Sequence, residues 1–249
     1  MGRLARKRQE RFARLRRFDH DIDPTAWSSE RLAGVDEAGV GPLAGPVVAA
    51  AVILPTDFDL PELYDSKQLS AAERQRCEVH IRERCVAFAI AHVSSRVIDR
   101  INILNAMLRA QSRAVARLEL RPLTILVDGN RAPSLPPAWQ AQLRTVVRGD
   151  GLSLAIAAAS VLAKSTRDRW MLRLERRFPG YGLAKHKGYA TSEHMDALRR
   201  RGLSPAHRRT FCRFLEEEAE IARQVRFEFA GPAARPLRRP RVQSKRRSL

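Results

Sequence analysis

The sequence contains no apolar run long enough to cross a membrane. Its longest apolar stretch, residues 43–54, is shorter than the ~18 residues that a spanning helix requires. The basic N-terminus leads into RFARLRRFDHDID rather than into the apolar core of a signal peptide. Glu10, Asp19, Asp21 and Asp23 argue against an organellar transit peptide, because such peptides are poor in acids. We therefore expect a cytoplasmic protein with no membrane partner.

Cysteine is also scarce, with three residues in the whole chain. Cys77, Cys85 and Cys212 are odd in number and do not have the close spacing of metal ligands. We expect reduced thiols that pack as small apolar side chains. Neither a disulfide framework nor a cysteine-based metal site is indicated.

Acidic residues are much fewer than basic ones. The chain has 46 Lys and Arg against 27 Asp and Glu, a formal net charge of +19. This excess favours a polyanionic partner, which for a chain of this size is most simply a nucleic acid. The alternative is that arginine-rich ends inflate the count, since residues 3–17 and 234–247 are both basic. The C-terminal RLRRPRVQSKRR alone does not account for the whole excess.

The remaining pattern predicts one α/β domain with a mixed sheet. We expect a basic helix or arm over about the first 25 residues, and a helix that begins at Ser70 with a capping box completed by Glu73. Further helices are expected over 97–120, from about Ser153 to Arg177, and once or twice more up to about residue 226. The expected strands are 31–37, 46–54, 85–94, 123–130 and 144–150, and residues 179–191 are expected to form a loop.

Three acids follow or close expected strands. Asp36 and Glu37 close the first strand and Asp128 closes the fourth. Any one of them could cap the next element or face solvent, but strand ends in an α/β sheet lie together and gather ligands. Carboxylates crowded there need a cation, and an all-oxygen set suits Mg²⁺ or Mn²⁺. Because neighbouring side chains on a strand point to opposite faces, we expect the strand to end or twist at Asp36 and Glu37.

A fourth acid lies on the helix expected over 153–177. Asp168 is seven residues after Val161 and fourteen after Leu154, so the three positions share nearly one helix face. If that face packs on the sheet, Asp168 is carried towards the sheet edge. The alternative is a solvated ion-pair face made with Arg167 and Arg169. Spacing alone does not decide between the two.

Six sequence blocks occur in a fixed order along the chain. They are GVDEAGVGPLAGPVVAAAVIL (34–54), DSKQLS (65–70), LVDGNR (126–131), AASVLAKSTRD (158–168), YGLAKHKGYAT (181–191) and HRRTF (207–211). In this order they resemble the ribonuclease HII family, the prokaryotic type 2 ribonucleases H. The first and fourth blocks together make the resemblance specific, and the whole set covers about residues 30–215.

The resemblance implies a ribonuclease H-like mixed sheet flanked by helices, with a helical C-terminal portion. We expect a catalytic domain over residues 29–226, whose C-terminal helices occupy about 187–226. The basic N-terminal arm expected over residues 1–28 and the basic disordered tail expected over 227–249 follow from their composition and lie outside the resemblance. The implied activity is hydrolysis of the RNA strand of RNA–DNA hybrids, and nicking at ribonucleotides embedded in duplex DNA. Two divalent ions, Mn²⁺ or Mg²⁺, would support it and leave 5′-phosphate and 3′-hydroxyl ends.

The resemblance also assigns residues. The family's four catalytic and metal-binding acids fall on Asp36, Glu37, Asp128 and Asp168. For Asp168 the resemblance therefore favours a place in the site over a solvated ion-pair face. The loop that reads the 2′-hydroxyl falls on Gly39, Val40 and Gly41, where Val40 departs from the family's usual arginine. A substrate-contacting tyrosine falls on Tyr189, and the matching blocks offer Lys67, Lys164, Lys187 and Arg208 as phosphate contacts.

Three alternatives stay open at this point. A sister family, ribonuclease HIII, carries an extra N-terminal domain, for which about 30 residues before the first strand are too few. Another ribonuclease H-like nuclease, such as a resolvase or integrase, would not be expected to share the specific blocks. A non-catalytic nucleic-acid-binding protein derived from a nuclease would be expected to lose acids, because uncompensated carboxylates near phosphate are costly.

Overall fold

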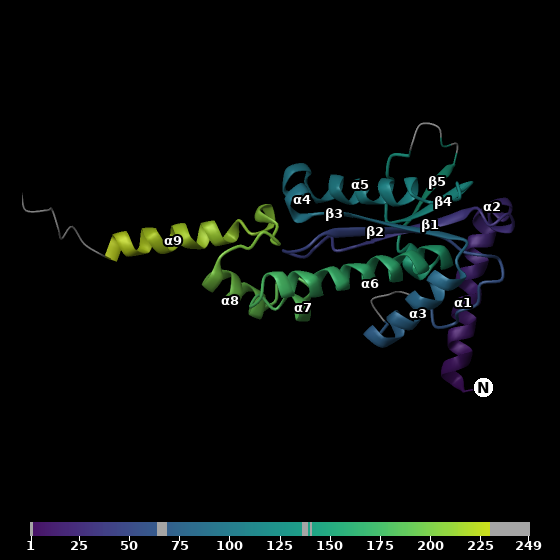
Figure 1. Cartoon of the computed structure of the whole chain (residues 1–249), viewed down its shortest axis with the longest axis horizontal. Coiled ribbons are helices and arrows are strands. Elements are labelled where there is room, and N and C mark those ends of the chain that lie inside the picture. Colours follow the sequence, from purple (N-terminus) through teal and green to yellow (C-terminus); the bar gives the residue numbers. More distant parts are fainter. Residues whose placement is uncertain (1, 64–68, 136–138, 140, 230–249) are drawn as a thin grey trace, which may run out of the picture. The chain divides into compact units, whose positions relative to one another are not determined.

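The computed structural model describes residues 2–63, 69–135, 139 and 141–229. Five strands form one sheet in the order β3-β2-β1-β4-β5 (Figure 1). β2 is antiparallel to β1 and β3, whereas β4 is parallel to β1 and β5, so the mixed sheet expected from the sequence is confirmed. The strands are β1 (Leu32–Ala38), β2 (Val47–Ile53), β3 (Ala87–Val93), β4 (Thr124–Asp128) and β5 (Gln142–Val146).

Helices cover both faces of this sheet. The capping box at Ser70 and Glu73 is present, and the helix expected over 153–177 is found as α6, with Ser153 as its N-cap. The helices are α1 (Arg3–Ile22), α2 (Pro24–Ser28), α3 (Ala71–Arg84), α4 (Ser95–Ile101), α5 (Ile103–Ala116), α6 (Leu154–Arg177), α7 (Leu183–His186), α8 (Ser192–Arg201) and α9 (Phe214–Phe229), with short 3₁₀ turns η1 (Gly149–Gly151) and η2 (Arg209–Phe211). None of the described helices is both long and apolar enough to span a membrane.

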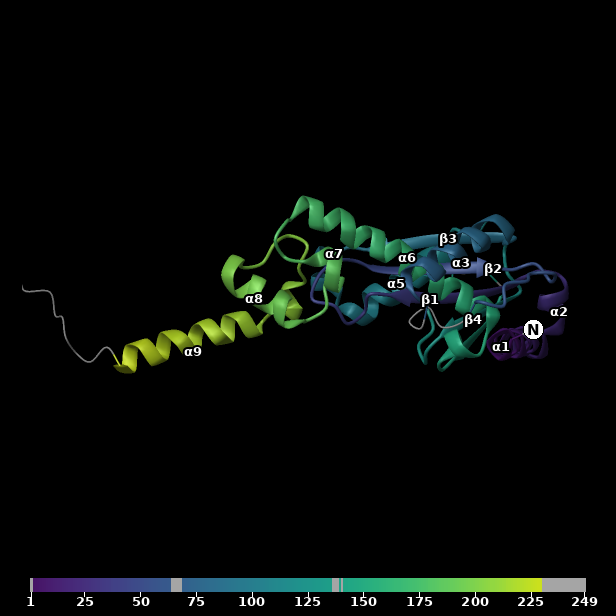
Figure 2. The ribbon, with the colours of Figure 1, turned by 90° about the horizontal axis from the view of Figure 1, so that it is seen from below.

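The two faces of the sheet pack against different helices. α4 and α5 lie on one face, and α6 lies on the other (Figures 1 and 2). Along β1, Ala33 and Val35 belong to the apolar cluster beneath α5. Gly34 faces α6, where an added Cβ would lie 2.1 Å from the Ala155 carbonyl carbon. Only glycine permits this approach, so α6 lies directly against the backbone of the central strand.

Helix α1 is anchored on the α6 side of the sheet. Phe12 and Leu15 are buried in the apolar cluster that α6 and α3 also share. The buried carboxylate of Asp19 accepts a hydrogen bond of 2.9 Å from the Ala155 backbone N–H, in the first turn of α6. The N-terminus of a helix favours an anion, so this contact ties the two helices together.

Two local expectations are wrong. The helix expected over 97–120 is broken into α4 and α5 at Asn102, whose φ is 62° and whose side chain caps the second helix by accepting from Asn105 N–H at 3.0 Å. The fifth strand ends at Val146, because Arg148 adopts a left-handed conformation and the chain turns into η1. In each case a local feature, the cap at Asn102 or the left-handed turn at Arg148, ends an element that the apolar pattern would continue.

Two compact units can be distinguished, Met1–Phe211 and Cys212–Leu249. The first contains the sheet and helices α1 to α8. The second contains α9, which agrees with the expected helix near the C-terminus. Residues 230–249, nearly all of the expected basic tail, lie outside the described residues.

The anchoring of α1 should depend on pH. Burial raises the pKa of Asp19 to about 7 from its ordinary value of 3.8, although hydrogen bonds from Ser153, Ala155 and Leu154 oppose the rise. The folded state therefore binds this proton more tightly than the unfolded chain does. The stability that Asp19 contributes is fully present below about pH 4 and is lost as the pH rises through about 7.

We expect Asp19→Asn to remove this dependence. Between about pH 4 and about pH 8, the free energy of unfolding of the wild type should fall relative to that of the variant. Parallel denaturant titrations at several pH values measure the difference. A difference that does not change with pH would show that Asp19 titrates normally.

Candidate active site at the end of strand β1

A pocket of about 240 Å³ lies where β1 and β4 end against α6. It brings together three of the four expected acids, the whole expected ribose loop and the expected tyrosine. Three side chains of α6 complete the lining. The lining residues are Asp36, Glu37, Ala38, Gly39, Val40, Gly41, Asp128, Ser160, Lys164, Arg167 and Tyr189.

The two adjacent acids of β1 point to opposite faces of the sheet. Pairing with β2 continues to Ala38, and the strand ends there, directly after these acids, as expected. Asp36 accepts a hydrogen bond from Ser160 of α6, whereas Glu37 Oε2 accepts one of 2.8 Å from Gln111 Nε2 of α5. Both carboxylates nevertheless line the pocket, because it lies at the end of the strand, where the two faces meet.

Asp36 occupies the most strongly perturbed position. Its carboxylate is buried, and this burial is the largest cause of a pKa well above the ordinary value. Repulsion from Glu37 and then from Asp128 raises the pKa further, and hydrogen bonds from Glu37 N–H and Ser160 oppose the rise. Because Glu37 and Asp128 both raise the pKa of Asp36, an added cation would relieve the repulsion at this carboxylate.

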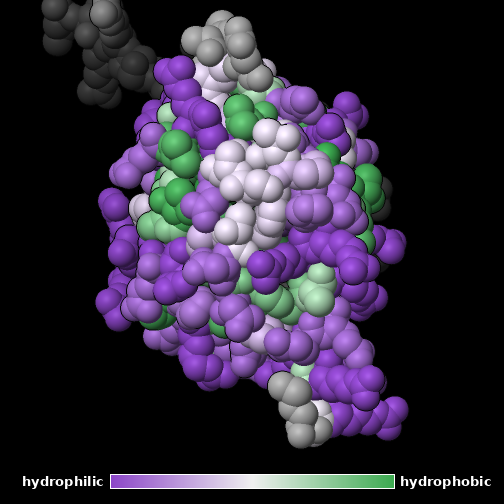
Figure 3. All heavy atoms as spheres, turned by 90° about the vertical axis from the view of Figure 1, so that its right-hand side faces the viewer, coloured by the Kyte–Doolittle hydropathy of each residue, from purple (hydrophilic) through white to green (hydrophobic). Residues whose placement is uncertain are grey.

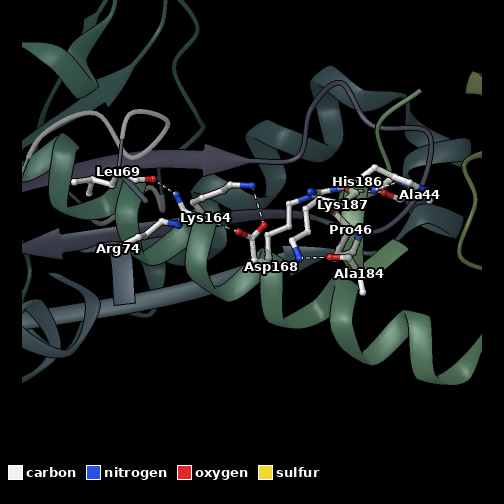
Figure 4. Close-up of polar contacts among 11 residues, drawn as sticks. Ala44, Pro46, Leu69, Arg74, Lys164, Asp168, Ala184, His186 and Lys187 are labelled. Carbon is white, nitrogen blue, oxygen red and sulfur yellow. Dashed lines mark hydrogen bonds and ion pairs between the residues drawn. The ribbon is translucent and has the colours of Figure 1, made fainter. Parts of the chain in front are cut away.

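The other two acids differ in how they are held. Asp128 ends β4, and its Oδ1 accepts a hydrogen bond of 2.6 Å from the Gly149 N–H. Asp168 lies beside the pocket and does not line it. Lys164 Nζ approaches Asp168 Oδ1 at 2.8 Å and Arg74 Nη2 approaches Oδ2 at 3.5 Å (Figure 4). Lys164 lines the pocket, so it connects the fourth acid to the other three.

The donor set fits a hard divalent cation. The acids of the pocket offer carboxylate oxygens, which are the ligands that Mg²⁺ and Mn²⁺ prefer. Within the described ranges, no three His, Cys, Asp or Glu side chains converge closely enough to enclose an ion already. Asp168 would have to exchange its contact with Lys164 for a metal contact to join the set.

Two buried arginines hold the glycine loop that borders the pocket. Arg208 is fully buried and donates to the carbonyls of Gly39 at 2.5 Å, Val40 at 2.8 Å and Gly45 at 3.1 Å. Arg167, at 1% exposure, donates to the carbonyls of Pro46, Ala44 and Lys187 at 3.0–3.1 Å. Buried guanidinium groups require such partners, so these bonds fix the path of residues 39–46.

One of the expected phosphate contacts is corrected by these positions. Arg208 cannot reach a phosphate from its buried place, and it supports the loop instead. The ammonium group of Lys187 donates to the Ala184 carbonyl at the end of α7 (Figure 4). Lys164 does line the pocket. Lys67 lies outside the described residues.

Gly39 is the tightest point of the loop. Its φ is +96°, and an added Cβ would lie 2.0 Å from Arg167 Nε and 2.8 Å from the Pro46 carbonyl oxygen. Gly41 differs, because nothing lies within 4 Å of an added Cβ and its φ is not positive. Val40 between them is 37% exposed, so its side chain faces solvent while its carbonyl binds Arg208.

Tyr189 is half exposed, and its backbone carbonyl contacts the first of two adjacent buried histidines, His194 and His207. His207 Nδ1 accepts from Ser204 N–H at 3.0 Å, so His207 Nε2 donates to His194 Nε2, 3.0 Å away. His194 Nδ1 in turn donates to the Tyr189 carbonyl at 2.9 Å. Burial lowers the pKa of His194 and lowers that of His207 to about 4, so both rings are neutral at physiological pH and this relay is intact.

Sequence reasoning missed three residues of the site. Ser160 and Arg167 are seven residues apart on α6, which is the same spacing that linked Val161 to Asp168. That signal was available, but Arg167 was interpreted only as a flanking charge. No sequence pattern pointed to Gln111, because it lies within the long helix α5 and reaches Glu37 only through the packing of that helix on the sheet.

Solved structures place this fold in a known class. The ribonuclease H2 from Pyrococcus horikoshii matches with a TM-score of 0.64 at 24% identity, over 75% of this chain and 97% of that one. A ribonuclease HIII, named Bst-RNase HIII and solved in complex with Mn²⁺, matches with a TM-score of 0.62 at 19% identity, over 80% and 72%. The chain therefore has the fold of the type 2 ribonucleases H.

Sequence comparison gives the family. The model of the ribonuclease HII family matches residues 33–214. The ribonuclease HII of Geobacillus thermodenitrificans is 47% identical over 204 residues, 82% of this chain and 76% of that protein. That of Dichelobacter nodosus is 51% identical over 181 residues, 73% and 94%. The chain belongs to the ribonuclease HII family and is a hydrolytic nuclease of the ribonuclease H type.

The glycine loop offers a matched pair of substitutions. We expect Gly39→Ala to destabilise the fold by about 1–3 kcal/mol, because it combines a disfavoured φ with a clash against buried Arg167. Gly41→Ala should change stability by less than about 0.5 kcal/mol. Thermal and denaturant unfolding of both variants measure this. Equal losses would show that Arg167 does not constrain the loop.

Gln111 offers a test of how Glu37 is held. Its Oε1 is buried and has no hydrogen-bond partner within the described residues, which is costly to stability. We expect Gln111→Met to leave the melting temperature unchanged or higher, while lowering kcat about 10–100-fold, as loss of a ligand's supporting hydrogen bond does. A fall in melting temperature with unchanged kcat would show that Gln111 serves packing alone.

Proposed function

We propose that this chain is an endoribonuclease that cleaves the RNA strand of RNA–DNA hybrids and nicks duplex DNA at embedded ribonucleotides. The products would carry 5′-phosphate and 3′-hydroxyl ends. One observation carries the proposal: the acids of β1 and β4 share a single pocket with a rigid glycine loop and an exposed tyrosine. Acids alone would suit many phosphodiesterases, but the loop and the tyrosine add means to recognise a ribose.

The carboxylates would hold the divalent ions. Asp36, Glu37 and Asp128 already share the pocket, and Asp168 would join them once Lys164 turns away. Bound there, two Mg²⁺ or Mn²⁺ ions would activate a water and stabilise the leaving oxygen. Ser160 and Gln111 orient the two acids of β1 from opposite sides, so the carboxylates are set before substrate arrives. The Mn²⁺ complex of Bst-RNase HIII is consistent with this choice of metal.

The loop and Tyr189 would recognise the substrate. Arg208 and Arg167 bind the loop through its carbonyls, which leaves the N–H groups of residues 39–41 able to approach a 2′-hydroxyl. The half-exposed ring of Tyr189 would stack on a sugar or base at the cleavage point. Lys164, released from Asp168 by the metal, would contact a phosphate.

Asp128→Asn tests the reaction. The substitution keeps the size of the side chain but removes a charge from the metal site, so we expect cleavage to fall by more than about 10³-fold while binding of a hybrid changes less than about threefold. The assay uses a DNA duplex with one ribonucleotide, with Mg²⁺, with Mn²⁺ and with chelator. A wild type that binds but never nicks would favour a non-catalytic nucleic-acid-binding protein.

Val40→Arg tests how the loop recognises ribose. If recognition runs through backbone N–H groups alone, an arginine adds nothing and KM stays unchanged. If its guanidinium also contributes, KM on a single-ribonucleotide substrate falls severalfold with little change in kcat; we expect this fall, since Val40 is exposed and a longer side chain fits there. Steady-state kinetics separate the two constants. An unchanged KM would show that an arginine is dispensable at this position.

A further inference from the structure

Helix α1 carries a row of basic side chains on its outward face. Arg3, Lys7, Arg14 and Arg17 are all exposed. At 100° per residue they lie within about 80° of one another around the helix axis, and over about 21 Å along it. Lys7, Arg14 and Arg17 also border one shallow hollow on the helix surface. We name these four residues the basic stripe.

The basic stripe is a fixed surface. Its helix is anchored on the opposite side by Phe12, Leu15 and the contact of Asp19 with α6. Arg16 adds a hydrogen bond of 2.5 Å to the Thr56 carbonyl. Glu10, the one acid between residues 3 and 18 in the sequence, borders the same hollow and is paired with Arg6 at 3.0 Å. The stripe therefore presents four positive charges, held in register by the helix, beside one carboxylate that is already paired.

Helix α1 lies close to the candidate active site. Arg8 forms an ion pair of 3.1 Å with Glu73, and the neighbouring Arg74 contacts Asp168. Along α6, Ala155, which Asp19 contacts, is nine residues before Lys164 of the pocket, an advance of about 14 Å. The end of the molecule that carries α1 is hydrophilic over the part where the helix projects (Figure 3).

We propose that the basic stripe binds the phosphate backbone of the duplex beyond the cleaved segment. This inference rests on the proposed function, which makes a duplex the substrate. A duplex rises about 3.4 Å per base pair, so a stripe of about 21 Å spans about six pairs. Helix α1 precedes residues 33–214, which the family model matches, so the stripe adds to the shared site. Sequence-independent phosphate contacts would raise affinity without moving the cut.

The test removes three charges of the stripe with Lys7→Gln, Arg14→Gln and Arg17→Gln together. Binding is measured on a 30-base-pair RNA–DNA hybrid in chelator, over a series of salt concentrations, so that no cleavage is needed. We expect the affinity at about 0.1 M salt to fall at least about tenfold, and the salt slope to become shallower by about 1 for each lost phosphate contact. Cleavage at saturating substrate should keep its kcat and its position.

A matched control removes the same charge from the other face of the sheet. Arg100→Gln, Arg109→Gln and Arg113→Gln together lie on α4 and α5, and all three side chains are exposed. Equal losses in both triple variants would overturn the proposal, because net charge alone would then explain them. An unchanged salt slope in the α1 variant would also overturn it.

A charge-preserving variant guards against a folding defect. Arg14→Lys with Arg17→Lys keeps the stripe positive and should bind as the wild type does; weak binding by this pair would overturn a purely electrostatic stripe. If the wild type binds through α1 yet never nicks, the proposed function fails while the surface stands. If the wild type nicks normally and the triple α1 variant binds as the wild type does, the proposed binding surface is wrong and the proposed function stands.

Discussion

The site depends on direct contact between α6 and the backbone of β1. Gly34 and the small residues of α6 allow a helix to lie where a side chain would otherwise keep it away. This contact sets Ser160 against Asp36 and carries Lys164 and Arg167 to the end of the strand. It also exposes the first turn of α6 to Asp19 of α1. One close approach therefore aligns the acids, the loop and the N-terminal helix.

A second layer of order comes from the two buried guanidinium groups. Arg167 and Arg208 come from segments 41 residues apart and both bind carbonyls of residues 39–46. Their charges are satisfied by backbone dipoles, which turns a glycine-rich loop into a rigid wall of the pocket. A flexible loop would lose conformational entropy at each binding event, whereas this loop is already ordered before it binds.

The acids illustrate a different balance. Asp36, Glu37 and Asp128 repel one another, and burial raises the proton affinity of Asp36 further. Gln111 holds Glu37, while its own buried carbonyl oxygen has no hydrogen-bond partner among the residues that the structure describes. These features weaken the fold locally and are typical of a site prepared for a cation. Asp168 is held differently, since its carboxylate pairs with Lys164 and Arg74.

The sequence by itself determined the family and the mixed sheet, because these follow from local patterns and contiguous motifs. It also singled out Asp36, Glu37 and Asp128, which the structure brings into one pocket. Spacing put Asp168 on the same helix face as Leu154 and Val161, but it did not decide the role of Asp168 or predict its pairing with Lys164 and Arg74. The sequence did not predict the break at Asn102, because the helical periodicity of residues 97–120 runs through the position where this side chain caps the fourteen-residue helix α5.

Only the tertiary structure decided the roles of Arg208, Gln111 and the two faces of β1. Arg208 has the charge of a phosphate ligand, and only its burial shows that it serves the loop. Gln111 is 74 residues from Glu37, so no local pattern could join them. Alternation predicted that Asp36 and Glu37 diverge, and the position of the pocket at the end of the strand explains how both still reach it. Contacts between distant segments depend on how the layers pack, which the linear order of residues does not contain.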